Sequence, residues 1–225
     1  MRALLLAYCP ILLWVFVALH LMFLYILFKN YMQTKNPLYL MAGLVSVGLF
    51  YDSLILSMGS VLNDGALLKS LSQLRFVSHG ALIPLLFPIC AYALGWKKKG
   101  KTITWVFTGL LMALGIAEGF SNMLELSEVA GVCRYTSGAA TPAWASAVSG
   151  ILSFGTVIPL MLSGAVVWKK QKTPTLFLSG FLMFAFSGLG PATGNFDLIF
   201  LISMFGEVFM VLFFYLYANH NQKHS

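Results

Sequence analysis

Seven long apolar stretches, separated by short polar breaks, constrain this chain more than any other feature of its sequence. A helix that spans a membrane needs ~20 consecutive, mostly apolar residues, and each stretch meets that length. The stretches cover residues 3–28, 38–60, 70–95, 102–126, 143–168, 174–193 and 196–218. The sequence therefore predicts an all-α, polytopic membrane protein with seven transmembrane helices.

The composition supports a membrane protein without a soluble part. Hydrophobic residues make up 59% of the 225 positions, charged residues make up 9%, and the mean hydropathy is +0.85. These values are far from those of a soluble domain. Because the stretches fill nearly the whole chain, residues 1–225 are expected to form a single transmembrane domain. The first stretch has no convincing small-residue cleavage site, so we expect a retained helix and not a signal peptide.

The basic residues are distributed unevenly along the chain and predict its orientation. A net charge of +7 suggests an anionic partner such as nucleic acid, but most of the lysines follow alternate stretches. They are Lys29, Lys35, Lys97, Lys98, Lys99, Lys101, Lys169, Lys170, Lys172 and Lys223. The positive-inside rule places these segments in the cytoplasm, with the N-terminus outside the cell membrane and the C-terminus inside. We expect the lysines to contact anionic lipid headgroups and not nucleic acid, and an oligomer is left open.

Polar and ionisable residues also fall inside the apolar stretches, where such side chains are costly and usually face the bundle interior or a wet cavity. The predicted orientation places most of them in the outer half of the membrane and the last near its middle. These candidate ligand or proton-site residues are Asp52, Arg75, His79, Glu118, Asn122, Glu125 and Glu207. Spacings of three and four residues place those of one stretch on one helix face.

Three further positions complete this inventory of polar residues. The segment TGNFD adds Asn195 and Asp197 at the outer lip of the bundle, whereas His20 falls in the inner half of the first stretch.

Arg75 needs a carboxylate to neutralise its charge in a low-dielectric interior, and Asp52 and Glu118 are the preferred partners. Two interpretations are open. One is a structural ion-pair network that joins the second, third and fourth helices. The other is a ligand or proton site, which the surplus of acids over a single permanent cation favours.

Small residues and prolines predict how the helices pack. Gly115 and Gly119 form a GxxxG pattern that is typical of close helix contact. Four prolines are expected to kink their helices, and kinks can open a cavity. They are Pro84, Pro88, Pro159 and Pro191.

Common motifs of catalysis and metal binding do not occur in the sequence. It has no CxxC, HExxH, P-loop or GxSxG pattern, and we expect no metal site. A bridge between Cys9 and Cys133 is geometrically possible, but no spacing pattern supports it.

The segment RFVSHGALIPLL, in a chain with seven helices and an outside N-terminus, resembles the third helix of microbial rhodopsins. The matching residues are Arg75, Phe76, Pro84, Leu85 and Leu86. The resemblance covers about two helices and the topology, and it implies a seven-helix bundle. Glu207 stands where the family has its retinal-binding lysine, so no Schiff-base retinal is expected. Ser78 occupies the family's counterion position, and His79 replaces a tryptophan that packs on retinal.

Three functions remain open, and no cofactor is identified. We favour a protein that binds and translocates a small molecule or ion through the polar residues above, with a proton as the coupling ion. A membrane-embedded enzyme acting on a lipid or prenyl substrate is the second alternative, with His79 and carboxylates as acid and base. A seven-helix sensor with an outward-facing pocket is the third.

Overall fold

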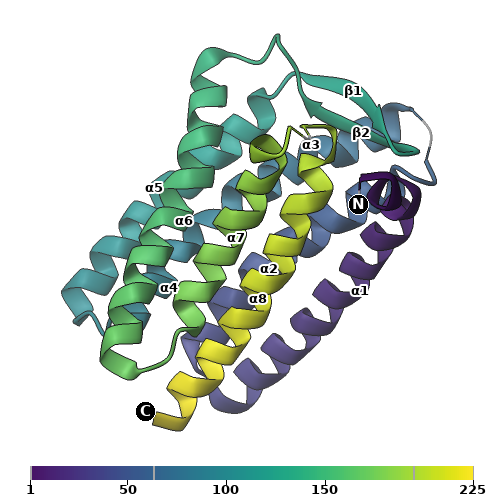
Figure 1. The fold of residues 1–225 in the computed structure, drawn as a ribbon. Helices are drawn as coiled ribbons and strands as arrows, with labels where there is room; N and C mark the ends of the chain where they lie inside the picture. The colour runs from purple at the N-terminus through teal and green to yellow at the C-terminus, as the bar shows by residue number, and fades with distance from the viewer. Residues whose placement is uncertain (1, 63, 195, 225) are drawn as a thin grey trace.

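The computed structural model describes residues 2–62, 64–194 and 196–224. The described chain is mostly helical, and its helices form an elongated bundle (Figure 1). The helices are α1 (Arg2–Thr34), α2 (Pro37–Met58), α3 (Ala66–Leu82), the 3-10 turn η1 (Ile83–Leu85), α4 (Leu86–Ala93), α5 (Lys98–Ser121), α6 (Ala143–Gln171), α7 (Thr175–Ala192), the 3-10 turn η2 (Phe196–Leu198) and α8 (Ile199–His224).

Six helices in the described part of the chain are long and apolar enough to cross a membrane. They are Ala3–Thr34, Pro37–Met58, Ala66–Ala93, Lys98–Ser121, Ala143–Gln171 and Ile199–Lys223. The remaining predicted stretch forms α7, in which Thr175–Leu189 is a shorter apolar helix. The helical, membrane-protein character of the chain is thus shown.

The third predicted stretch is one rod made of α3, η1 and α4. Pro84 lies in η1, where its missing N–H and its ring prevent a regular α-helical turn. Consecutive helices are neighbours around the bundle, and α8 closes the ring against α1 and α2. α1 begins and α8 ends at opposite ends of the bundle (Figure 1).

A β-hairpin between α5 and α6 was not predicted. Strand β1 (Leu124–Val129) pairs antiparallel with β2 (Val132–Ser137). The helix predicted over residues 102–126 ends at Ser121 because Asn122 adopts an extended backbone, with φ −66° and ψ 123°. Ala130 and Gly131, both at positive φ, form the tight turn, as two-residue hairpin turns require.

The hairpin is fastened to the start of α3 and the end of α2. Cys133 donates its backbone N–H to Gly59 O at 2.9 Å. The Tyr135 hydroxyl donates to Asp64, and this hydrogen bond raises the pKa of Tyr135. The predicted helix is therefore wrong over residues 124–126, and a hairpin caps this end of a chain that is otherwise mostly helical.

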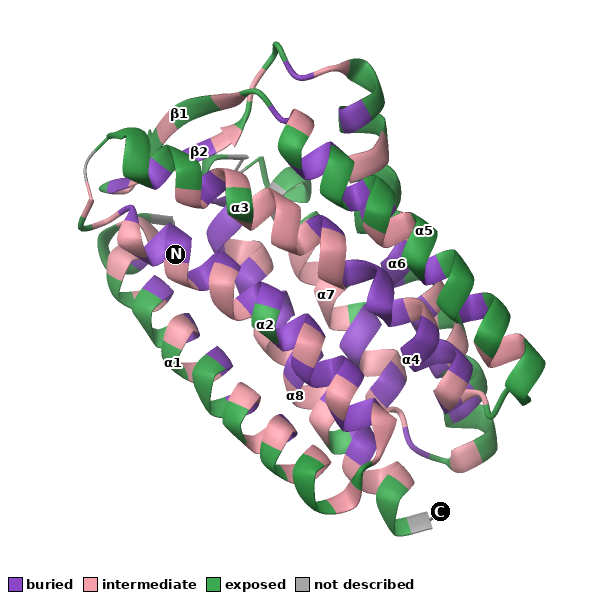
Figure 2. Cartoon of the chain, turned by 180° about the vertical axis from the view of Figure 1, so that it is seen from behind, coloured by how far each residue is buried: buried purple, intermediate pink, exposed green. Residues whose placement is uncertain are grey.

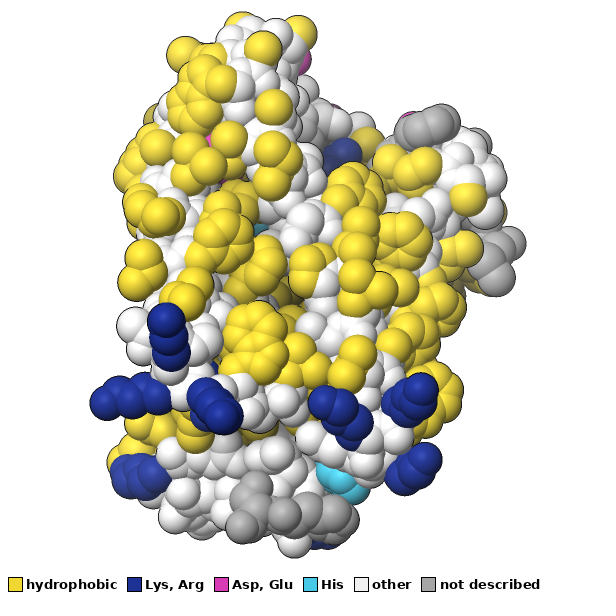
Figure 3. All heavy atoms as spheres, turned by 90° about the vertical axis from the view of Figure 1, so that its left-hand side faces the viewer, with side chains coloured by type: hydrophobic (Ala, Val, Ile, Leu, Met, Phe, Trp, Pro, Cys, Tyr) yellow, Lys and Arg dark blue, Asp and Glu magenta, His cyan; other side chains and the backbone are white. Residues whose placement is uncertain are grey.

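The end of the bundle away from the hairpin is packed closed. Buried apolar residues run through the bundle interior and exposed residues cover its outward faces (Figure 2). Hydrogen bonds reinforce this end, including Tyr39 to Asn219 at 2.5 Å and Asn36 to Gln222 at 3.1 Å. On the face shown in Figure 3, basic side chains gather around this end, and the molecule divides at the other end into two lobes with a hollow between them.

Two glycine contacts bring α3 and α5 together. A Cβ atom on Gly80 would lie 2.3 Å from the carbonyl oxygen of Gly115, so both residues must be glycine at this crossing. A Cβ on Gly119 would lie 2.6 Å from Cα of Val77. The GxxxG pattern thus serves close helix packing. It also holds Glu118, between these two glycines, against α3.

Candidate functional site

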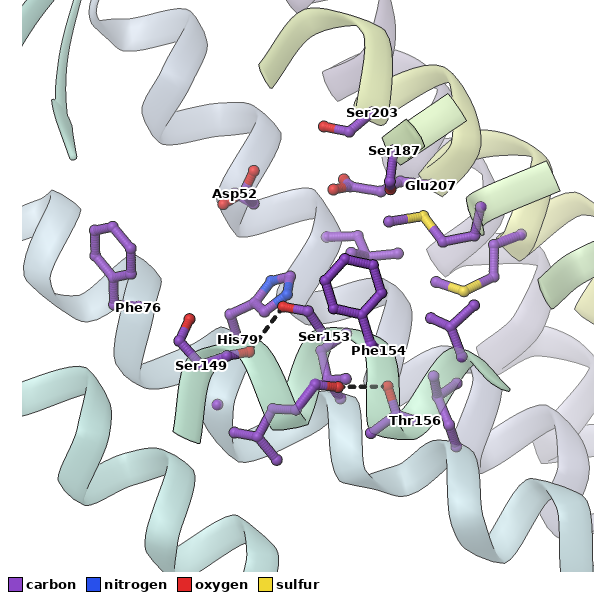
Figure 4. A pocket seen from close by; sticks show the side chains of 18 of the residues that line it. Asp52, Phe76, His79, Ser149, Ser153, Phe154, Thr156, Ser187, Ser203 and Glu207 are labelled. Atoms are coloured by element: carbon purple, nitrogen blue, oxygen red, sulfur yellow. Dashed lines mark hydrogen bonds between the residues drawn. The ribbon is translucent and has the colours of Figure 1, made fainter. Parts of the chain in front are cut away.

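A cavity of about 410 Å³ lies inside the bundle, and five of the predicted site residues line it (Figure 4). Its apolar walls come mainly from leucine, isoleucine, methionine and phenylalanine side chains. Its polar and ionisable lining residues are Asp52, Arg75, His79, Glu118, Ser149, Ser153, Thr156, Ser187, Ser203 and Glu207. A mostly apolar cavity with a few convergent polar groups is typical of a small-molecule site.

Arg75 is held by partners from three directions. Its Nη1 donates to Asp52 Oδ1 at 3.0 Å, and its Nη2 donates to the carbonyl oxygen of Tyr135 at 3.1 Å. The guanidinium carbon also lies 4.7 Å from the centre of the Phe76 ring. Arg75 therefore joins α3 to α2 and to the hairpin. The Asp52 partner was predicted, whereas the hairpin carbonyl had no signal in the sequence.

Glu118 does not pair with Arg75, so this second predicted partnership is wrong. Its Oε1 accepts a hydrogen bond from Nδ2 of Asn122 at 2.7 Å, and Asn122 also donates to the backbone oxygen of Glu118 at 3.1 Å. Both residues are buried. Asn122 thus acts behind the cavity: it orients the Glu118 carboxylate, which is itself part of the lining.

Glu207 brings a carboxylate into the cavity from α8. Its side chain is 5% exposed, and Oε2 has no hydrogen-bond partner among the described residues. Figure 4 shows the carboxyl group of Glu207 pointing toward Asp52, with Ser187 and Ser203 close to it. A buried carboxylate oxygen without a partner costs free energy unless a proton, water or ligand satisfies it.

The cavity has more acids than bases. Asp52, Glu118 and Glu207 line it, and Arg75 is the lone arginine or lysine among its described lining residues. Because Arg75 is bonded to Asp52, two carboxylates are left without a salt bridge. Three of the four acids in the surplus expected from the sequence therefore lie around one space, and Glu125 does not.

Other predicted positions lie away from the cavity. Glu125 is on β1, where its Oε1 accepts a hydrogen bond from the backbone N–H of Ala139 at 3.0 Å. Its placement on the same helical face as Glu118 is wrong, because the helix ends before it. Asp197 is in η2 and does not line the cavity, and Asn195 lies outside the described residues.

His20 is closer to the site than its position in the first stretch suggested. It is fully buried, and neither ring nitrogen has a hydrogen-bond partner within the described chain. The charge of Asp52 acts on it electrostatically, although His20 does not line the cavity.

Sequence reasoning missed the contribution of α6. Ser149, Ser153 and Thr156 line the cavity from positions i, i+4 and i+7, which share one helix face. The hydroxyls of Ser153 and Thr156 donate to carbonyls of their own helix, at 2.9 and 2.7 Å. This polar stripe in an apolar helix was a detectable signal, whereas the neighbouring Phe154 carried none.

Metal binding and disulfide formation find no support in the geometry. Within residues 2–62, 64–194 and 196–224, no three His, Cys, Asp or Glu side chains form a group that could hold a metal ion. Cys9, Cys90 and Cys133 are free thiols, so the bridge between Cys9 and Cys133 is not formed.

Comparison with protein-family models finds no match to this chain, and comparison with curated proteins finds no significant relative. Its function must therefore be argued from the site.

Replacing Arg75 with alanine should strongly destabilise the protein, because it leaves Asp52 as a buried carboxylate without its partner. Breaking a buried pair costs about 3 to 5 kcal/mol. Thermal unfolding in detergent measures the effect, and Lys98→Ala, at an exposed position, is the control. Equal melting temperatures for the two variants would show that solvent already neutralises Arg75.

Proposed function

We propose that α7 is a seventh transmembrane helix and that the hairpin end of the bundle faces outward at the cell membrane. The 18 residues of α7 extend over about 27 Å, close to the thickness of a bilayer core. The basic side chains gathered at the opposite end support a cytoplasmic location for that end (Figure 3). An odd number of crossings agrees with the start of α1 and the end of α8 at opposite ends of the bundle (Figure 1).

Cysteine-accessibility labelling in intact cells tests this orientation. Single cysteines within residues 97–101 and after residue 219 should react only when the membrane is permeabilised, and those within residues 128–142 should react from outside. Labelling of residues 97–101 by an impermeant reagent in intact cells would reverse the orientation and the proposed depth of the cavity.

We infer that the cavity binds and translocates a small molecule or ion. The observation that carries this proposal is the cavity itself, with two carboxylates beyond the Asp52–Arg75 pair. A purely structural network would satisfy its own charges, whereas Glu207 keeps a buried oxygen without a partner among the described residues. A cationic ligand or a proton would supply the missing interaction.

The cavity is open in one half of the bundle and closed in the other, as expected for one conformational state of a carrier protein. Ser153, Phe154 and Phe184 line the cavity and are also exposed, so the cavity opens to the outside of the bundle. Toward the basic end, the core around Leu27, Leu38 and other apolar residues fills the bundle. This arrangement is that of a site that opens on the flank of the bundle, in its hairpin half, and is closed toward the basic end.

An enzyme acting on a lipid or prenyl substrate is the second candidate, and the exposed mouth of the cavity favours it. His79 lies in the cavity with several serines, but no hydrogen bond joins it to a hydroxyl or a carboxylate among the described residues. An activated nucleophile requires such a contact with its base. The geometry therefore supports binding more directly than covalent catalysis, and a sensor would use the same pocket without translocation.

Reconstitution into liposomes tests the proposed function. The probes are labelled ethylammonium, tetramethylammonium and butyrate, and a pH-sensitive dye inside the vesicles reports coupled proton movement. Wild-type protein should take up at least one cationic probe. Glu118→Gln should melt close to the wild type, because the amide still accepts a hydrogen bond from Asn122, but it should lose uptake with the charge.

Glu125→Gln is the matched control, because it makes the same chemical change outside the cavity and should retain uptake. Full uptake by Glu118→Gln, or no uptake of any probe by the wild type, would contradict the proposal. Chemically altered vesicle lipids, detected by mass spectrometry, would favour the enzyme instead.

A further inference from the structure

The mouth of the cavity lies between α6 and α7 and is framed by two aromatic rings. Phe154 and Phe184 line the cavity, yet they are 57% and 42% exposed. Their ring centres are 6.4 Å apart, with an edge-to-face angle of 73°. Large apolar side chains that are both lining and exposed mark an opening through which the cavity meets its surroundings.

The seam between α6 and α7 is tight at one end and open at the other. A Cβ on Gly164 would lie 2.5 Å from Cα of Phe177, and a Cβ on Gly180 would lie 2.9 Å from Cγ of Met161. Gly150 lies almost four helical turns from Gly164 toward the start of α6, on about the same face, and a Cβ there would meet nothing within 4 Å.

On α7 too, a glycine nearer the hairpin end has open surroundings. Gly188 follows Phe184 by four residues, which places the two on one face, and a Cβ on Gly188 would also meet nothing within 4 Å. The two helices therefore touch through their backbones near the α6–α7 loop. Neither Gly150 nor Gly188 makes such a contact toward the hairpin end, and the phenylalanine pair lies between these two regions.

The depth of the mouth places it against lipid. Phe154 lies 11 residues after Ala143, and Phe184 lies 8 residues before Ala192. At 1.5 Å per residue these distances are about 16 and 12 Å from the outer helix ends. In the proposed orientation, this depth lies within the hydrocarbon of the outer leaflet.

The chemistry behind the mouth selects the ligand. Beyond the Asp52–Arg75 pair the cavity holds two further acidic side chains, and Glu207 offers a carboxyl oxygen that has no partner in the described chain. The route to these acids runs past Phe154, Phe184 and Met183, which are apolar. A molecule that fits both parts has a cationic head and an apolar tail.

We propose that the α6–α7 seam is a lateral portal through which the site takes up an amphiphile with an amine head and a single apolar tail from the outer leaflet. The head binds near Glu207, and the tail runs past the Phe154–Phe184 pair, whose rings are in contact and must part to let it through. This proposal rests on the proposed function, because it names the ligand class and entry route of the same cavity.

Photolabelling in phosphatidylcholine nanodiscs tests the portal. The probe is dodecylammonium with a diazirine at the tail end, and dodecanol and dodecyl sulfate with the same group are the matched uncharged and anionic probes. The ammonium probe should label wild-type protein most strongly, on peptides of α6 and α7. Glu207→Gln should remove the preference for the ammonium head over the uncharged one.

Two matched pairs of variants report on the route. Gly188→Trp fills the open end of the seam and should lower ammonium labelling about tenfold, whereas Gly109→Trp, on α5 with equally open surroundings, should match the wild type. Phe184→Ala should speed labelling, whereas Phe181→Ala, one turn away with the same 42% exposure but outside the cavity lining, should not.

The outcomes distinguish entry through the lateral portal from cation binding in the cavity. If Glu207→Gln removes head selectivity but Gly188→Trp labels like the wild type, the cavity binds cations and the lateral portal is wrong. Equal labelling of wild-type protein by all three probes would overturn the ligand class. If Gly188→Trp melts at a lower temperature than Gly109→Trp, its loss of labelling is explained by unfolding. The comparison of Phe184→Ala with Phe181→Ala then tests the portal: equal labelling rates for these two variants would show that it is wrong.

Discussion

The ion pair between Arg75 and Asp52 organises the hairpin half of this bundle. A guanidinium inside an apolar bundle is stable only when its charge is paired. Asp52 on α2 provides the charge, and the carbonyl of Tyr135 provides a second acceptor from the hairpin. The pair therefore sets how α2, α3 and the outer cap meet. It also neutralises the one arginine of the cavity lining, so that Glu118 and Glu207 remain available to other partners.

Helix packing then determines the shape of the space around this pair. Glycines at the crossing of α3 and α5 allow backbone contact and hold Glu118 against the cavity wall. Large apolar side chains close the basic end of the bundle, whereas neither Gly150 on α6 nor Gly188 on α7 makes a backbone contact toward the other end. The same bundle is thus sealed toward the proposed cytoplasmic side and open where its acids lie. These properties support the proposal that the cavity binds a cation.

Much of the fold was predictable because hydropathy is a strong signal over a whole helix. The apolar stretches correspond to helices or to continuous helical rods, and the rod broken by Pro84 follows its third stretch. The hairpin was missed because its two strands are only six residues long and because β1 follows the apolar helix α5 without a glycine or proline between them. Glu125 was misplaced for the same reason, since three-residue spacing places side chains on one face only while the helix continues.

The site was predictable in its residue types and less so in its pairings. Ionisable residues such as Asp52, Arg75 and Glu207 are easily found in an apolar sequence. Which acid pairs with Arg75 depends on side-chain packing, and sequence spacing does not determine that packing. Glu118 accepts a hydrogen bond from the nearby Asn122 and does not pair with Arg75. Hydroxyls of α6 escaped notice because serine and threonine are common in membrane helices, where they bond their own backbone.

A high-resolution structure of the protein extracted with its native lipids tests the central claim, that the cavity is a ligand site, most directly. The account predicts non-protein density in the cavity, with a polar atom within hydrogen-bond distance of Glu207 and an apolar part near Phe154 and Phe184. A cavity filled by the protein's own side chains, with both oxygens of Glu207 bonded to protein groups, would contradict it and leave a structural ion-pair network.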